Sequence, residues 1–155
     1  MPETPNGIIY PDASAHTRLW EHFQALADSV DTALGSLLSP SVSTSLPASS
    51  GWTVPAASVH LMRMGAICVI RFEASSNAPI AAVANGNIGD QLVAGPLPAD
   101  MIPPRIAMGV ANSLAVGASM FRVDTSGQIT LATLPPGVGL SAGVLLTFSA
   151  AYSAA

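Results

Sequence analysis

The stretch VLLTFSAAY, from Val144 to Tyr152, decides the fold, because its side chains alternate between two kinds. In a β-strand successive side chains point to opposite faces, so every second residue shares a surface. One face would carry Val144, Leu146, Phe148, Ala150 and Tyr152, and the other Leu145, Thr147, Ser149 and Ala151. A strongly apolar face opposite a mixed one predicts a strand that covers a hydrophobic core.

Short runs of the same kind recur throughout residues 52–155. Residues 121–131 predict a hairpin around the turn DTSG, and the runs at 58–64 and 66–74 predict a strand pair joined near Gly65. Residues 91–95 and 105–112 supply two more strands. Roughly seven or eight short strands with turn signals between them predict a mainly β head over 52–155, closed as a β-sandwich or jelly-roll-like barrel.

Residues 14–38 predict one amphipathic helix, which Asp12 or Ser14 can cap and Pro40 ends. Its main apolar positions follow spacings of four and three residues, as in the heptad seam of a coiled coil. The seam consists of Leu19, Phe23, Leu26, Val30, Ala33 and Leu37. Two interpretations are open, a short coiled coil or an ordinary helix packed on its own domain.

Two proline-bearing segments flank this helix. Residues 39–51, SPSVSTSLPASSG, predict a Ser/Pro linker with too few large apolar residues to pack. A helix held away from the head by a linker must bury its apolar stripe elsewhere, which favours the coiled coil. Residues 1–13 predict an extended arm, since their prolines oppose a helix, and Ile8, Ile9 and Tyr10 form a small apolar knot suited to docking.

The segment GPLPADMIPPR, residues 95–105, lies between two expected strands and mixes prolines with large apolar residues. Prolines cannot pair in a central strand, but they hold a crossover rigid at little entropic cost. We therefore expect a stiff crossover that is fixed to the sheet edge or to a neighbouring subunit. Its contact residues would be Leu97, Met101, Ile102, Pro103 and Pro104.

The composition excludes several classes of protein. Only 9% of the residues are charged and the net charge is −4, whereas soluble domains carry about 25% charged residues. Without a basic stripe we expect no nucleic-acid binding. No apolar run approaches the roughly 18 residues of a spanning helix, and the N-terminus lacks the features of a signal peptide, so we expect no membrane insertion.

A search for catalytic and metal-binding patterns gives nothing specific. His16 and His22 are six residues apart, so they do not share a helix face as a zinc pair would. The single Cys68 lies in an apolar run, where a buried, inert thiol is the expected state. Acidic residues of the head fall near expected turns, where exposed carboxylates are common. We expect no enzymatic activity, no catalytic residue, no metal and no cofactor.

Several motifs together carry a family resemblance: the arm PNGIIYPDAS, the helix ALADSVDTAL, the Ser/Pro linker, and then GW, LPADMIPPR and VDTSGQITL in the head. With these motifs the chain resembles small virion proteins of tailed bacteriophages, especially those of actinobacterial hosts. The family is that of tail-fibre or appendage proteins of the minor-tail or head-fibre type.

The resemblance implies a homotrimer, in which the helices zip together and the β heads pack around a threefold axis. It also implies a location in the virion, on the tail or the capsid surface, with the arm bound to another virion protein. The seam residues themselves do not specify three strands.

Two kinds of function follow. In a receptor-binding tail appendage the head would hold a host cell-wall glycan, with Asn85, Asn87, Asp90, Gln91 and Asn112 as candidate ligand residues. Trp52 could serve as an aromatic plate for a sugar, although a structural role at the base of the head is the favoured interpretation. Alternatively the protein is a capsid head fibre, a decoration spike or a baseplate adaptor without receptor specificity. A small depolymerase is a third, disfavoured hypothesis.

Overall fold

A computed structural model describes residues 19–154 of the chain. Two compact units follow each other in sequence, and they divide after Pro40. The first contains the helix α1 (Leu19–Leu38), and the second, Ser41–Ala155, is a β-rich head. In the described part no helix has the length and apolar character needed to cross a membrane. The expected anchor residues Ile8, Ile9 and Tyr10 lie outside the described residues.

Helix α1 confirms the expected helix from Leu19 onward, while residues 14–18 lie outside the described part. The side-chain amide of Gln24 donates to Asp28 at 2.8 Å, because residues four apart are neighbours on one face of a helix. The backbone amide of Ser39 donates to Gly35 at 2.9 Å and closes the last turn before Pro40. Within the expected seam, Phe23 is 61% exposed and Leu26, Val30 and Ala33 are partly exposed. The side chains of Leu19 and Leu37 are not described.

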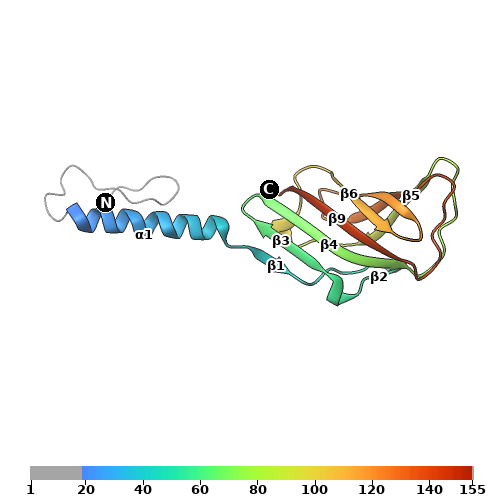
Figure 1. Ribbon diagram of the computed structural model, residues 1–155, viewed down its shortest axis with the longest axis horizontal. Helices are drawn as coiled ribbons and strands as arrows, with labels where there is room; N and C mark the ends of the chain where they lie inside the picture. Colours follow the sequence, from blue (N-terminus) through green and yellow to red (C-terminus); the bar gives the residue numbers. More distant parts are fainter. Residues whose placement is uncertain (1–18, 155) are drawn as a thin grey trace. The chain divides into compact units, whose positions relative to one another are not determined.

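The described part of the head holds nine strands in one antiparallel sheet (Figure 1). They are β1 (Ser41–Ser43), β2 (Trp52–Thr53), β3 (His60–Met64), β4 (Ile67–Ser76), β5 (Asn87–Ala94), β6 (Ala107–Ser113), β7 (Gly117–Val123), β8 (Ile129–Thr133) and β9 (Leu145–Ser153). The order is β1-β3-β4-β9-β6-β7-β8-β5, and β2 pairs with β4. Two short 3₁₀ helices, η1 (Ala56–Ser58) and η2 (Ala99–Met101), lie in connections.

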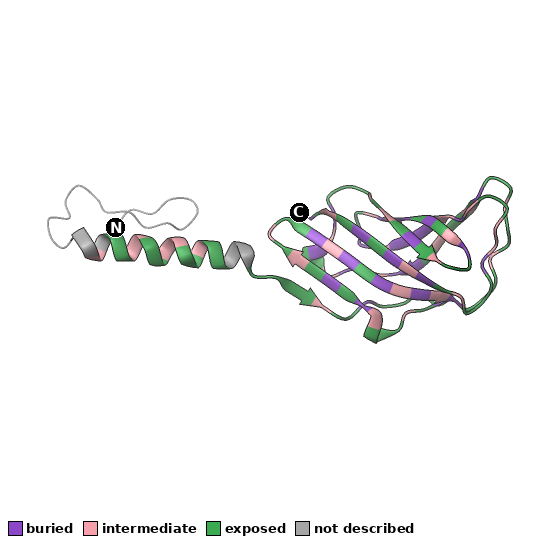
Figure 2. Ribbon diagram, in the orientation of Figure 1, coloured by how far each residue is buried: buried purple, intermediate pink, exposed green. Residues whose placement is uncertain are grey.

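The sheet curls around a single core, so that its two ends approach each other. Ala48, between β1 and β2, forms an isolated antiparallel bridge with Ala94 at the end of β5. The mainly β prediction is confirmed, and the strands form one continuous curled sheet. Buried and exposed residues alternate along β4 and β9, as the sequence of β9 predicted (Figure 2).

Aromatic rings fill the centre of this core. The rings of Phe72 and Phe148 stack with centroids 4.7 Å apart, and Phe121 meets Phe148 edge-on at 5.2 Å. Trp52 is 6% exposed. Its ring lies nearly perpendicular to the ring of Phe148, with the two centroids 6.4 Å apart. Trp52 is therefore a core residue, in agreement with its structural interpretation, and offers no plate to a sugar.

The expected linker 39–51 needs correction, because most of it belongs to the head. Residues 41–43 pair with β3, and Leu46 is buried at 7% exposure. The backbone amide of Ser49 donates to Val93 at 3.0 Å. A short Ser/Val run suits an edge strand, and one leucine is enough to fix it on the core. Only Ser39 and Pro40 separate α1 from β1.

The proline-rich crossover is held on the head by buried side chains and hydrogen bonds. Leu97 and Met101 are 3% and 0% exposed, so neither side chain can contact a neighbouring subunit. Arg63 donates to the carbonyl oxygen of Asp100, and the Tyr152 hydroxyl donates to that of Met101 at 2.8 Å. Ile102 is partly buried, Pro103 is buried and Pro104 is exposed. An interface role thus remains a proposal for Ile102 and Pro104 alone.

Candidate functional site

The outward face of β3, β4, β9 and β6 carries a band of polar side chains. Strand register brings them together: His60 lies opposite Arg71, Arg71 opposite Ser149, and Glu73 opposite Thr147, which in turn lies opposite Asn112. We call the set the polar band, and it consists of His60, Arg71, Glu73, Thr147, Ser149 and Asn112. All six are outward-facing, since the residues between them in each strand point into the head.

Two hollows open onto the polar band. The first, of about 410 Å³, is lined by His60, Arg71 and Glu73 together with Pro55, Ala57 and Ser58. The second, of about 490 Å³, is lined by Thr147, Ser149 and Asn112 together with Val110, Ser113 and Leu114. Ligand sites in proteins range over roughly 300–1,000 Å³, so each hollow has room for a small ligand.

The side chains of the polar band are not engaged in holding the fold. Within the described part of the chain, none of the six forms a side-chain hydrogen bond or an ion pair. Arg71 and Glu73 do not form an ion pair with each other, although they are two residues apart on one strand face. Their hydrogen-bonding capacity is therefore available to a ligand.

One wall of the first hollow is fixed by Ser58. Its hydroxyl donates to the carbonyl oxygen of Pro55 at 2.7 Å and accepts the backbone N–H of Glu73 at 3.1 Å. These bonds tie η1 to the middle of β4. The hollow is thus built on paired strands and a tethered turn, which fix the backbone that carries its side chains.

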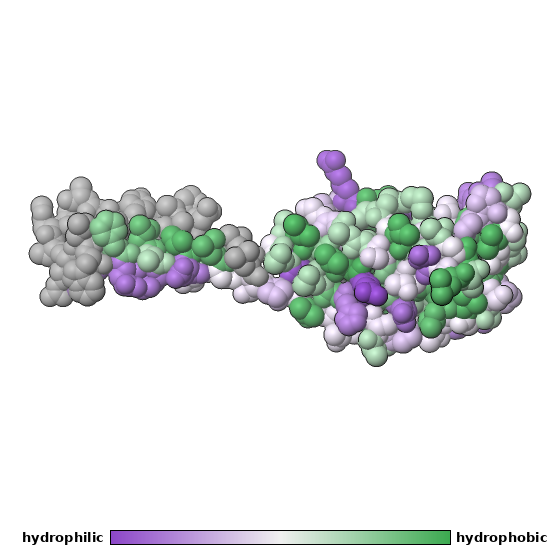
Figure 3. Space-filling view, viewed as in Figure 1, coloured by the Kyte–Doolittle hydropathy of each residue, from purple (hydrophilic) through white to green (hydrophobic). Residues whose placement is uncertain are grey.

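Beside the polar band lies an apolar one on the same face. Val42, Met62 and Val69 are laterally paired across β1, β3 and β4, and Val69 lies opposite Ala151 of β9. Met108 of β6 lines a third hollow, of about 360 Å³, together with Ala151. We call these five residues the apolar band. Val42 is 64% and Met108 50% exposed, and Figure 3 shows apolar side chains distributed over the visible face of the head.

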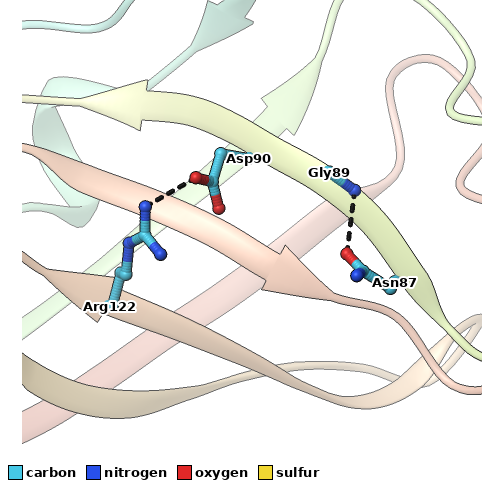
Figure 4. A network of polar contacts seen from close by, with 4 residues as sticks. All are labelled: Asn87, Gly89, Asp90 and Arg122. Atoms are coloured by element: carbon cyan, nitrogen blue, oxygen red, sulfur yellow. Dashed lines mark hydrogen bonds and ion pairs between the residues drawn. The ribbon is translucent and has the colours of Figure 1, made fainter.

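Four of the five expected ligand residues lie elsewhere, at the edge strand β5 and the turn before it. There Asp90 pairs with Arg122 at 2.6 Å, and the Asn87 side chain accepts the Gly89 backbone N–H at 3.2 Å (Figure 4). Asn85 accepts the backbone N–H of Asn87, and Gln91 donates to the carbonyl of Ile88. These side chains shape a bulged edge strand, so the structure keeps only Asn112 of the expected set in the polar band.

The Cys68 thiol and the Tyr152 hydroxyl, which could be reactive groups, have structural roles here. Burial raises the pKa of the Cys68 thiol, which opposes formation of a reactive thiolate. Burial also raises the pKa of Tyr152 well above its usual range, and its hydroxyl is a hydrogen-bond donor to the crossover. In the described part no cluster of His, Cys, Asp and Glu side chains could hold a metal ion.

Sequence reasoning missed Arg71, Glu73, Thr147 and Ser149 as site residues. The alternation in 66–74 and 144–152 already placed them on outward faces. No local pattern in the sequence indicates that β4 pairs with β9, because the two strands are about seventy residues apart.

Comparisons with known proteins show which solved structures resemble this fold. No family model and no curated protein matches the chain. The receptor-binding protein gp15 of Listeria phage PSA aligns over 95% of this chain and 89% of its own, with 13% identity and a TM-score of 0.51. The head domain of the lactococcal phage bIL170, a receptor-binding domain, aligns over 76% of this chain and 100% of its own, with 15% identity and a TM-score of 0.47.

The match with the Listeria phage protein shows a fold like that of a phage receptor-binding protein. The expected resemblance to phage proteins is thus supported as a likeness of fold. The narrower expectation of an actinobacterial host gains no support from this match, which is to a protein of a Listeria phage.

Proposed function

We propose that the chain is a receptor-binding component of a tailed-phage appendage, a tail fibre or tail-tip protein whose head attaches to a glycan of the host cell surface. The observation that carries this proposal is the fold, which aligns over nearly the whole of this chain and of a Listeria phage receptor-binding protein. An open sheet face with uncommitted polar side chains adds support. Binding without catalysis is the proposed activity.

Self-association belongs to the same proposal. The helix exposes Phe23 and partly exposes Leu26 and Val30, so its stripe can be buried only against another surface. Since only two residues separate α1 from β1, helices that associate would bring copies of the head close to one another. The uncharged apolar band can then pack against a neighbouring head. We propose a homotrimer, with the arm 1–13 anchored to another virion protein.

A capsid head fibre, decoration spike or baseplate adaptor is the second candidate. The extent of the exposed apolar face favours it, because such a surface fits stable contact with other virion proteins. Antibody-gold labelling of intact particles of the source phage separates the two candidates. We expect gold at the tail tip, whereas gold over the capsid would overturn the proposed tail function.

A further inference from the structure

We infer that the polar band is a groove that binds a neutral oligosaccharide. Arg71 and Glu73 would form hydrogen bonds with the ligand in the first hollow, and hydroxyl and amide groups would do so in the second. This inference rests on the proposed function and deepens it, because it names the residues and the class of ligand.

The charge of the first hollow selects a neutral ligand. Arg71 contributes one positive charge and Glu73 one negative charge on the same strand face. A phosphate or a sugar acid would gain the attraction of Arg71 but meet the repulsion of Glu73. A neutral ligand with adjacent hydroxyl groups suits both, since the guanidinium only donates and the carboxylate only accepts. Adjacent hydroxyls are the defining feature of a sugar ring.

The second hollow extends the same chemistry along the sheet. Ser149 and Thr147 lie directly opposite Arg71 and Glu73, and Asn112 lies opposite Thr147. Hydroxyl and amide groups both donate and accept hydrogen bonds, so they match sugar hydroxyls in either orientation. From β3 to β6 the band spans three strand spacings, about 14 Å in all, which is longer than one sugar ring. The ligand is therefore an oligosaccharide that crosses the strands.

The walls of the groove are apolar but not aromatic. Pro55 and Ala57 line the first hollow, and Val110 and Leu114 line the second, with Leu114 fully exposed at the tip of the β6–β7 hairpin. These groups can contact the C–H face of a sugar, but no Trp, Tyr or Phe ring lines either hollow to stack on it. Affinity of a single head for a short oligosaccharide would therefore be weak. Several heads on one particle would gain about 10²–10⁴ in avidity.

The test uses the purified full chain and an array of neutral and uronic-acid-bearing oligosaccharides. We expect neutral members to bind, and the affinity for the best of them to fall at least about tenfold in both Arg71→Gln and Glu73→Gln, since each change removes a charged hydrogen-bonding group. Arg105→Gln is the matched control, because it makes the same charge change at an exposed arginine outside the polar band. It should bind within about twofold of the parent. Unchanged thermal unfolding of all three variants verifies that their heads are folded.

Three results would overturn the inference: binding of acidic members alone, no binding of any neutral member, or unchanged affinity in both band variants. A separate experiment tests the proposed function: the purified chain competes with the phage for adsorption to host cells. If the parent chain and Arg71→Gln compete equally well, host attachment stands and this groove is wrong. If neutral sugars bind but the chain never competes, the groove stands and host attachment is wrong.

Discussion

At the scale of single residues, small side chains in the strands allow the central rings to pack. Gly109 of β6 lies against Phe121, so that an added Cβ would come within 2.3 Å of the ring and 2.7 Å of the Ala150 Cβ. Neither neighbour can withdraw easily, because Phe121 also packs on Phe148 at the centre of the core. The space at Gly109 is thus a requirement of the fold.

We predict that Gly109→Ala destabilises the head by about 1–3 kcal/mol through overpacking. The free energy of unfolding, measured in denaturant, checks this. Gly51→Ala is the matched control, since an added Cβ there meets nothing within 4 Å. Equal stability of the two variants would show that the Phe121 ring is not packed as described.

Asp124 is a second residue that stabilises local structure, in the turn between β7 and β8. Its Oδ1 accepts hydrogen bonds from the Ser126 backbone N–H at 2.8 Å, the Ser126 hydroxyl at 2.6 Å and the Gln128 backbone N–H at 3.0 Å. Partial burial alone would raise the pKa of this carboxyl, but the hydrogen bonds from Ser126 and Gln128 outweigh it and hold the pKa below its usual value of 3.8. The ionised carboxylate therefore stabilises the hairpin turn.

The sign of the pH dependence follows. A carboxyl whose pKa is lower in the folded state adds stability above its unfolded pKa, and loses it as the pH falls through the folded one. We predict that Asp124→Asn lowers the free energy of unfolding by about 1 kcal/mol at pH 7. The difference from the parent should shrink below pH 3.8, the ordinary value for this carboxyl. A difference that stays constant from pH 7 to pH 3 would contradict the role of the charge.

At the scale of elements, the proposed self-association rests on helix α1 and the apolar band of the sheet. The polar side of α1 holds Gln24, Asp28 and Thr32, which form hydrogen bonds within the helix. The other side holds the apolar stripe. A helix of this kind is stable only when the stripe is buried.

We predict that Leu26→Asp dissociates the oligomer, because it would place a charge against apolar partners. Light scattering on the purified chain measures the mass directly. Thr32→Asp is the control on the polar side, and its mass should equal that of the parent. An unchanged mass for Leu26→Asp would exclude the seam as the basis of association.

Local patterns were readable from the sequence at this scale, while pairings were not. The alternation in β9 and the 4-3 spacing in α1 depend only on neighbouring residues, and both elements formed where expected. Thr147 and Arg71 lie in one polar band only because β9 pairs with β4, which no local pattern encodes. The polar residues 85–91 stand out in the sequence, yet Asn in a turn commonly bonds its own backbone, as Asn85 and Asn87 do, and Asp90 pairs with Arg122.

At the scale of the whole molecule, the chain combines an apolar helix stripe, an apolar band and a polar band in 155 residues. Such a surface carries few charges, which agrees with the low share of charged residues, 9%, in the sequence. Association would use the apolar surfaces and recognition the polar band. The fold, like that of a phage receptor-binding protein, accommodates both on one sheet.

The most direct test of host attachment is competition for adsorption. Host cells are incubated with increasing amounts of the purified full chain, and the adsorption rate of the source phage is then measured. We predict that adsorption falls as the protein concentration rises, and that Arg71→Gln competes more weakly than the parent while Arg105→Gln competes as well as the parent. An adsorption rate that does not change at any concentration of the parent chain would contradict a receptor-binding function.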